Sequence, residues 1–225
     1  MKNIAIIPAR SGSKGLKNKN IKMLNGKPLL AYSIVAAIES KCFDTIIVST
    51  DSKKYATIAT KYGAEVPFIR SKLTSCDTAS SWDVVKEVLD EYHIRGKQFD
   101  TFTLLQPTSP LRNSNDIKVC FKMYKEKKAN SIISVCEADS SIITYELSND
   151  FNISKSLRRK KMNTRRQDIK KVYKNNGAIY LANVKHFLKT NNIYDNKCYA
   201  YVMNKRNSID IDDITDFKIA EALLK

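Results

Sequence analysis

A turn rich in glycine and cations follows the first apolar run of the chain. It reads Pro8-Ala9-Arg10-Ser11-Gly12-Ser13-Lys14-Gly15-Leu16-Lys17-Asn18-Lys19-Asn20. Glycine lets backbone N–H groups approach phosphate oxygens, Arg10 can bind two oxygens at once, and Lys14 and Lys19 supply point charges. The turn is neither a P-loop nor a dinucleotide fingerprint, because GxxxxGK[ST] and GxGxxG are absent. It suits a triphosphate whose leaving group gains negative charge, and the alternative is a basic solvent loop.

Two carboxylates stand two residues apart near the end of the sequence, in Ile209-Asp210-Ile211-Asp212. At a strand end, side chains at positions i and i+2 point to the same side. Two such oxygens suit Mg²⁺, a hard cation that keeps several waters and also binds substrate phosphates. The alternative role for Asp210 and Asp212 is capping of the last helix, which Asp213 and Asp216 are also placed to do.

Two further polar segments precede or follow predicted elements. Residues 75–81 read as a helix N-terminus capped by Asp77, Thr78 or Ser80, and its free N–H groups can bind an anion or a base edge. Gln106 follows a predicted strand and enters a proline-fixed turn, where its amide offers a donor and an acceptor to a polar ligand. A plain cap and a plain turn are the alternatives.

Length and composition limit the class of protein. The chain has 225 residues, of which 43% are hydrophobic and 28% charged, so we expect one domain over 1–225 with a full core. No apolar run approaches the roughly 20 residues of a membrane helix, which predicts a cytoplasmic protein without a membrane partner. The five cysteines are never spaced as CxxC, which argues against a disulfide framework and a zinc site.

The net charge of +16 indicates attraction to polyanions, whether nucleotides, acidic sugars or nucleic acid. Half of the residues in 154–171 are Lys or Arg, so a basic nucleic-acid-binding protein is a rival hypothesis. That segment lacks stacking aromatics, and no recognition-helix or RNP-like motif occurs, so no specific nucleic-acid partner is expected. A solvated basic surface is the third interpretation.

The elements that must position these residues alternate along the chain. Short β-branched or apolar runs lie at 4–8, 45–50, 101–106 and 131–136, and segments of helical period follow at 28–40, 52–62, 80–92 and 115–127. This order predicts an α/β fold with a doubly wound, mostly parallel sheet, in which ligands bind beyond the carboxyl ends of the strands. An inserted arm is predicted at about 137–170. Strands at 177–182 and 198–203 and helices at 184–190 and 213–224 complete the domain.

Five segments together resemble the cytidylyltransferases that activate sialic acid and related nonulosonic acids as CMP-sugars. They are IIPARSGSKGLKNKNI at 6–21, Asp77-Thr78-Ala79-Ser80, Leu104-Leu105-Gln106-Pro107-Thr108-Ser109-Pro110-Leu111-Arg112, Asn176-Gly177-Ala178-Ile179-Tyr180, and Ile209-Asp210-Ile211-Asp212. The resemblance spans nearly the whole chain, and it implies a Rossmann-like sheet, CTP and an acidic nonulosonic sugar as substrates, and Mg²⁺ as cofactor.

The resemblance also implies roles for individual residues. The side chains expected to hold CTP are Arg10, Ser13, Lys14, Lys19 and Asn20, of which Arg10, Lys14 and Lys19 would act in catalysis. Those expected to close on the nucleotide are Arg70, Thr78 and Ser80. Gln106, Arg166 and Tyr180 would face the sugar, and Asp210 and Asp212 would hold Mg²⁺. Such proteins are usually homodimers, so the arm at 137–170 is expected to be a dimerisation arm that reaches toward the partner's site.

The resemblance implies direct displacement, and the absence of a Ser/His/Asp or Cys/His nucleophile set from the sequence agrees with it. The anomeric hydroxyl of the sugar would attack the α-phosphorus of CTP, and pyrophosphate would leave. The sugar side departs from the family pattern, since the expected His-Pro-x-Lys is absent from 138–143 and Ile193-Tyr194 replaces a phenylalanine pair. Sialic, legionaminic and pseudaminic acids therefore all stay open as acceptors. The eight-carbon acid of lipopolysaccharide is a further alternative, which the turn at 12–20 and the Asp210–Asp212 pair disfavour.

Overall fold

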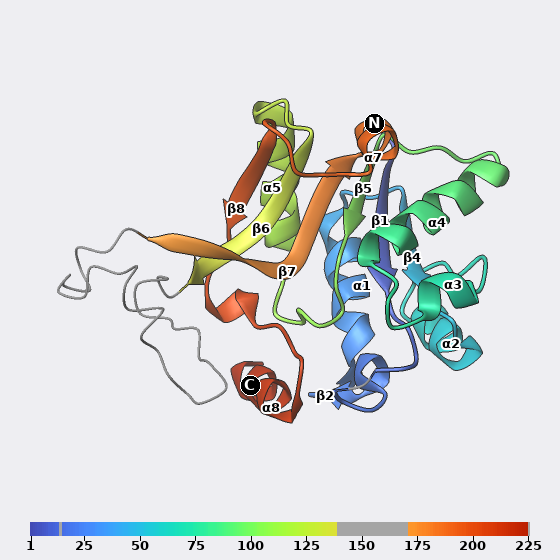
Figure 1. Cartoon of the computed structure of the whole chain (residues 1–225). Coiled ribbons are helices and arrows are strands. Elements are labelled where there is room, and N and C mark those ends of the chain that lie inside the picture. The colour runs from blue at the N-terminus through green and yellow to red at the C-terminus, as the bar shows by residue number, and fades with distance from the viewer. Residues whose placement is uncertain (14, 139–170, 225) are drawn as a thin grey trace, which may run out of the picture.

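The computed structural model describes residues 1–13, 15–138 and 171–224. Its centre is a six-stranded sheet in the order β4-β1-β5-β7-β6-β8 (Figure 1). The strands are β1 (Asn3–Pro8), β4 (Thr45–Ser49), β5 (Thr101–Leu104), β6 (Ser131–Ala138), β7 (Val172–Asn183) and β8 (Cys198–Val202). Strand β7 runs antiparallel to β5 and β6, and the other neighbouring pairs are parallel. The predicted doubly wound, mostly parallel sheet is confirmed.

Helices cover both faces of this sheet. Those on one face are α1 (Leu29–Ser40), α2 (Lys53–Lys61) and α5 (Ser114–Glu126), and those on the other are α4 (Ser81–Ile94) and α7 (Val184–Thr190). Strand β1 shows why both faces are filled: Ala5 and Ile7 lie in one core, and Ile4 and Ile6 lie in the other. All four are fully buried, as expected for a central strand whose side chains alternate between two helical layers.

A small hairpin and the last helix form a third cluster. Strands β2 (Met23–Leu24) and β3 (Lys27–Pro28) are joined by Asn25 and Gly26, both at positive φ, as a tight hairpin turn requires. Helix α8 (Ile214–Leu223) lies beside this hairpin (Figure 1), and Ile211 and Phe217 pack against Leu24. This packing anchors the chain segment that carries the two aspartates of the sequence motif.

Three predicted boundaries differ from the structure. Strand β7 begins at Val172 and not at residue 177, because the polar residues Lys174 and Asn175 still pair with β6. Asn176 follows them in the irregular middle of β7. The arm predicted at 137–170 falls mainly on residues outside the described part, and its first two residues belong to β6. Residues 209–212 are not a strand end, since they are irregular backbone between a 3₁₀ turn (Arg206–Ser208) and α8.

Within the described ranges, no helix has the length and apolar character needed to cross a bilayer.

Candidate functional site

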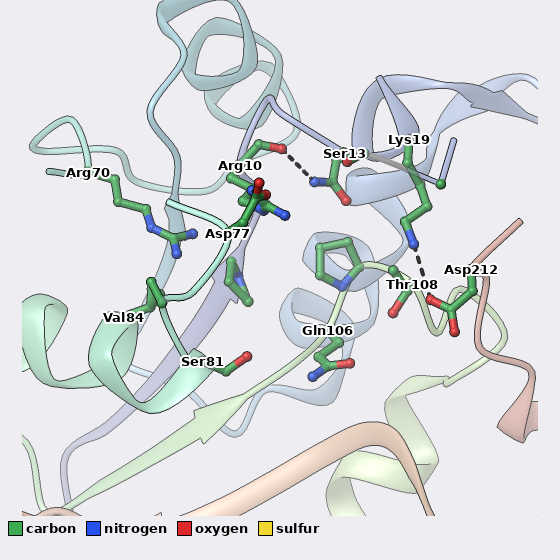
Figure 2. A pocket seen from close by; sticks show the side chains of 15 residues that line it. Arg10, Ser13, Lys19, Arg70, Asp77, Ser81, Val84, Gln106, Thr108 and Asp212 are labelled. Carbon is green, nitrogen blue, oxygen red and sulfur yellow. Dashed lines mark hydrogen bonds and ion pairs between the residues drawn. The ribbon is translucent and has the colours of Figure 1, made fainter. Parts of the chain in front are cut away.

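A cavity of about 460 Å³ lies beyond the carboxyl ends of β1 and β5, where the sheet topology predicts a ligand (Figure 2). Pro8 ends β1, and Gln106, Pro107 and Thr108 follow β5. The glycine-rich turn contributes Arg10, Ser13, Gly15, Lys19 and Asn20 to the wall, and Asp212 closes the far side. Four of the five residues predicted from this turn to hold a nucleotide are therefore brought together, whereas Lys14 lies outside the described residues.

Side-chain tethers hold the glycine-rich turn in shape. Asp51, which follows β4, accepts hydrogen bonds from the Ser11 backbone N–H (2.8 Å) and from Ser11 Oγ (2.9 Å). Buried Asn20 donates from Nδ2 to the carbonyl of Arg10 at 3.0 Å. Asn20 thus has a structural task besides its predicted contact with the nucleotide, and Asp51 is a supporting residue that the sequence did not reveal.

Two arginines face the cavity in different electrostatic settings. Arg10 donates from Nη1 to Asp77 Oδ1 at 2.6 Å, which links the glycine-rich turn to the loop before α4 (Figure 2). Arg70 is only 7% exposed, and its Nε has no hydrogen-bond partner among the described residues. Burial lowers the pKa of Arg70, and nearby Arg10 adds to that effect while Glu87 opposes it. A buried cation with spare hydrogen-bonding capacity favours an anionic ligand.

The N-terminus of α4 (Ser81–Ile94) divides its serines between two tasks. Ser80 is the N-cap, because its Oγ accepts from Asp83 N at 3.2 Å and its own N–H donates to Asp83 Oδ2 at 2.8 Å. Ser81 instead lines the cavity. Thr78, also expected on the nucleotide, lies outside the cavity lining, and its hydroxyl is 3.3 Å from Cys76 Sγ. The sequence predicted a capped helix N-terminus here, and Ser80 is the cap, but it did not distinguish the capping serine from the serine that lines the cavity.

Lys19 joins the glycine-rich turn to the acidic segment. Its Nζ donates to the Ile211 carbonyl at 2.6 Å and lies 3.5 Å from Asp212 Oδ1 (Figure 2). The Lys19 side chain is 14% exposed and that of Asp212 is 82% exposed. Gly15 lies against the same segment, because a Cβ at Gly15 would come within 2.7 Å of the Asp212 carbonyl oxygen. The glycine-rich turn and the acidic segment, residues 209–212, are thus in direct contact.

Asp210, the first aspartate of the pair, is more buried than Asp212. Asp210 Oδ1 is buried with no hydrogen-bond partner in the described structure. Burial raises the pKa of Asp210. The negative charges of Asp212 and Asp216 raise it further, whereas a hydrogen bond from Thr108 and the positive charge of Lys19 lower it. The unpartnered carboxylate oxygen of Asp210 is a fitting ligand for a hard cation.

The fit to Mg²⁺ depends on the number of ligands. In the described part of the chain, no group of three or more His, Cys, Asp or Glu side chains is arranged to hold a metal. Asp210 and Asp212 would therefore supply two oxygens, and the remaining positions would fall to water and phosphate. That division is the one Mg²⁺ commonly shows at nucleotide sites.

Gln106, which lines the cavity, and Tyr180, which lies on β7, are the two described residues that were expected to face the sugar. The Gln106 carbonyl accepts from Arg112 Nη1 at 3.2 Å and from Ser33 Oγ at 3.3 Å, which fixes its backbone. Tyr180 stacks edge-on against Trp82 at 5.5 Å and lies outside the cavity lining. Burial raises the pKa of Tyr180, and the charges of Tyr194 and Asp210 raise it further.

Two further arginines need separate comment, because one lies outside the described residues and the role of the other was not predicted from the sequence. Arg166, expected on the sugar, lies outside the described residues. Arg112 is fully buried and was recognised only as part of a motif. Its side chain connects Gln106, Ser33 and the carbonyl of Ala178. A lone arginine in a turn gives no sequence signal for such a bracing role.

Comparison with known proteins gives independent evidence for the family of this chain. A family model described as Cytidylyltransferase matches residues 4–223. The chain is 34% identical to CMP-N,N'-diacetyllegionaminic acid synthase of Legionella pneumophila, over 100% of this chain and 97% of that protein. It is also 34% identical to the pseudaminic acid cytidylyltransferase of Campylobacter jejuni, with the same coverage.

Other relatives are longer or more distant. The chain is 41% identical to N-acylneuraminate cytidylyltransferase of Escherichia coli O18:K1:H7 over 97% of its length, but it spans only 51% of that protein. A solved CMP:2-keto-3-deoxy-manno-octonic acid synthetase complexed with CTP covers the whole chain with a TM-score of 0.72 at 16% identity, which shows the shared fold. The arrangement of the site, the family match and the full-length relatives agree, and the chain belongs to the cytidylyltransferase family that includes the CMP-sialic acid synthetases.

Proposed function

We propose that the protein transfers CMP from CTP to the anomeric hydroxyl of a nonulosonic acid and releases pyrophosphate. The observation that carries this proposal is the contact of Lys19 with the Ile211 carbonyl and with Asp212. This contact joins the cationic glycine-rich turn to the segment that holds the carboxylate pair. The relatives named for legionaminic, pseudaminic and N-acylneuraminic acids support the same reaction class.

The residues divide the work by charge. Arg10, Lys14 and Lys19 would neutralise the charge that grows on pyrophosphate as the bond to the α-phosphorus breaks. Buried Arg70 would add a fixed cation to the nucleotide side. Asp210 and Asp212 would hold Mg²⁺, which supplies further neutralisation of phosphate charge. The displacement needs no enzyme nucleophile, so the main demand on the chain is to hold the two substrates in line.

The acceptor side rests on Gln106, Tyr180 and Arg166. A guanidinium at Arg166 would match the carboxylate of an α-keto acid sugar with two parallel hydrogen bonds. Gln106 lines the cavity and can offer its amide to a sugar hydroxyl. Sialic, legionaminic and pseudaminic acids share the carboxylate and the anomeric hydroxyl, so all three are candidate acceptors.

A homodimer and a cytoplasmic location are part of the same proposal. If an arm of one subunit completes the partner's site, an inactive Asp212→Asn subunit mixed with an inactive Arg166→Ala subunit should recover part of the activity, since one site of the mixed dimer contains neither lesion. No recovery in confirmed mixed dimers would assign Arg166 to its own subunit's site. A monomer in sedimentation would end the dimer proposal.

The reaction is tested by pyrophosphate release with each of the four nucleoside triphosphates, Mg²⁺ and a panel of acceptors. The panel contains sialic, legionaminic and pseudaminic acids and the eight-carbon acid of lipopolysaccharide. Turnover with CTP and one nonulosonic acid is the expected result. Preference for the eight-carbon acid would replace the proposed acceptor class, and lack of turnover with every pair would overturn the reaction.

A further inference from the structure

The middle of β7 bulges away from its partner strand β6. Ile133 pairs with Tyr180 and Val135 pairs with Asn175, so a single residue of β6 faces four residues of β7. Bulges of this kind redirect a backbone and occur often next to functional sites. Here the four residues are Asn-Gly-Ala-Ile at 176–179. Among them, Gly177 lies against the side chain of Gln106, which lines the cavity.

Buried side chains close the bulge and fix its shape. Ser134 Oγ accepts from Ile179 N at 2.8 Å and lies 2.6 Å from Asn176 Oδ1. Asn176 Nδ2 donates to Ser208 Oγ at 2.9 Å, two residues before Asp210. Ser134 and Asn176 are both at least 97% buried. The bulge is therefore tied both to the sheet and to the chain that leads into the acidic segment.

Gly177 is the point of this bulge nearest the proposed site. It has φ of 74°, and a Cβ added there would lie 2.8 Å from Gln106 Oε1 and 3.4 Å from Asp210 Oδ2. The residue assigned to the sugar and a residue assigned to Mg²⁺ thus reach within 3.4 Å of one point in space. Only a residue without a side chain leaves that point free.

A side chain at this position would displace Gln106 before anything else. A distance of 2.8 Å is shorter than Cβ atoms tolerate, whereas 3.4 Å to Asp210 is close to ordinary contact. The Gln106 backbone is braced by Arg112 Nη1, which also donates to the Ala178 carbonyl at 3.0 Å. The strain would therefore be relieved by rotation of the Gln106 side chain.

We propose that Gly177 is a positioning residue for the acceptor: its missing side chain lets the Gln106 amide and the Asp210 carboxylate converge where the sugar meets the metal-bound nucleotide. This role rests on the proposed function. The contact on which it depends does not, because the approach of Gln106 to Gly177 is a property of the folded chain alone. The two claims can therefore be tested apart.

Gly96 provides a matched control for the backbone. It has φ of 73°, nearly the same as Gly177, and a Cβ added there would meet nothing within 4 Å. Gly96→Ala and Gly177→Ala thus impose similar left-handed strain. We expect both variants to lower Tm, with the larger drop in Gly177→Ala. That variant should also raise the KM for the acceptor about tenfold or more while the Kd for CTP, measured by calorimetry with Mg²⁺, stays within about twofold.

The deciding experiment combines Gly177→Ala with Gln106→Ala. If Gly177 acts through Gln106, the added methyl group should cost less Tm in the Gln106→Ala background, where it should match Gly96→Ala, and it should leave the acceptor KM unchanged there. An undiminished effect in that background would overturn the proposal. Should Gly177→Ala alone fail to fold, recovery of folding by Gln106→Ala supports the contact and continued failure overturns it. Inactivity of the wild type with every acceptor would refute the reaction, and the Tm comparison would still decide the contact.

Discussion

Lys19 is the residue through which the two halves of the proposed site act on each other. Its ammonium group contacts the Ile211 carbonyl and lies near Asp212, while its own loop faces the cavity. A cation in that position can neutralise a phosphate and also hold the acidic segment in place. The two tasks have different kinetic signatures, so substitution separates them.

We predict that Lys19→Ala lowers kcat about 100-fold or more and raises the KM for CTP much less, because its charge is most needed as pyrophosphate leaves. Lys17→Ala is the matched control, since Lys17 is an exposed lysine on the same turn and lies outside the cavity lining. Steady-state kinetics with CTP and a saturating acceptor give both constants. An effect confined to KM would reduce Lys19 to uniform nucleotide binding.

For Asp212 we expect activity and folding to separate. Its side chain is largely exposed, so Asp212→Asn should leave Tm nearly unchanged while Mg²⁺-dependent turnover falls strongly, because one of the two proposed metal-binding carboxylates loses its charge. Asp90→Asn, at an exposed position on α4, is the control. Calorimetric titration with Mg²⁺ in the presence of CTP should show weaker binding only in Asp212→Asn. Wild-type turnover at ordinary Mg²⁺ would refute the metal assignment.

The N-terminus of α4 shows how one element can combine support and binding. Ser80 closes a capping box with Asp83, and Ser81 turns to the cavity. The helix start is therefore held by one serine while the next is available to a ligand. The free N–H groups of that first turn add to the attraction for an anion or a base edge.

We predict opposite results for the two serines. Ser80→Ala should lower the free energy of unfolding by about 1 kcal/mol, as loss of an N-cap usually does, with little change in the KM for CTP. Ser81→Ala should leave stability nearly unchanged and raise that KM. Urea denaturation and initial-rate kinetics on both variants measure the two quantities. A larger rise in the KM for CTP from Ser80→Ala than from Ser81→Ala would show that Ser80, and not Ser81, contacts the nucleotide.

The elements differ in how far the sequence predicts them. The strands at 4–8 and 45–50 are predicted closely, because buried parallel strands are written as continuous apolar runs. The start of β7 is missed, because Lys174 and Asn175 are polar and only their pairing with β6 reveals the strand. The site follows the same rule. Cations and glycines announce their chemistry locally, whereas the bracing by Asp51 and Arg112 depends on contacts far along the chain.

At the scale of the whole molecule, the two helical layers bury several tyrosines beside acidic groups. Tyr92 donates to Glu65 Oε2 at 3.0 Å, and Tyr201 donates to Asp116 Oδ1 at 2.9 Å. Burial raises the pKa of both phenols well above the ordinary value of 10, and the neighbouring carboxylates raise it further. Burial also raises the pKa of Tyr32, Tyr55, Tyr124 and Tyr180.

These tyrosines predict that the protein loses stability in alkali. The unfolded chain releases phenolic protons near pH 10 while the folded chain retains them, so their contribution is complete below about pH 10 and disappears as the pH rises toward the folded pKa values. Arg112 and Arg70 act in the opposite direction, because burial lowers the pKa of both, that of Arg112 to about 10, but they are two groups against six tyrosines. The free energy of unfolding in urea should therefore change little with these groups up to about pH 9 and fall as the pH rises through and above about 10.

Tyr201→Phe identifies the source of this alkaline loss. The variant gives up the hydrogen bond to Asp116, so it should be less stable than the wild type at pH 8. It also lacks one raised phenol, so its stability should fall less steeply with pH, and the two curves should converge at high pH. Tyr173→Phe, at an exposed position in β7, should keep the wild-type slope. Parallel curves for Tyr201→Phe and wild type would show that another set of groups controls alkaline unfolding.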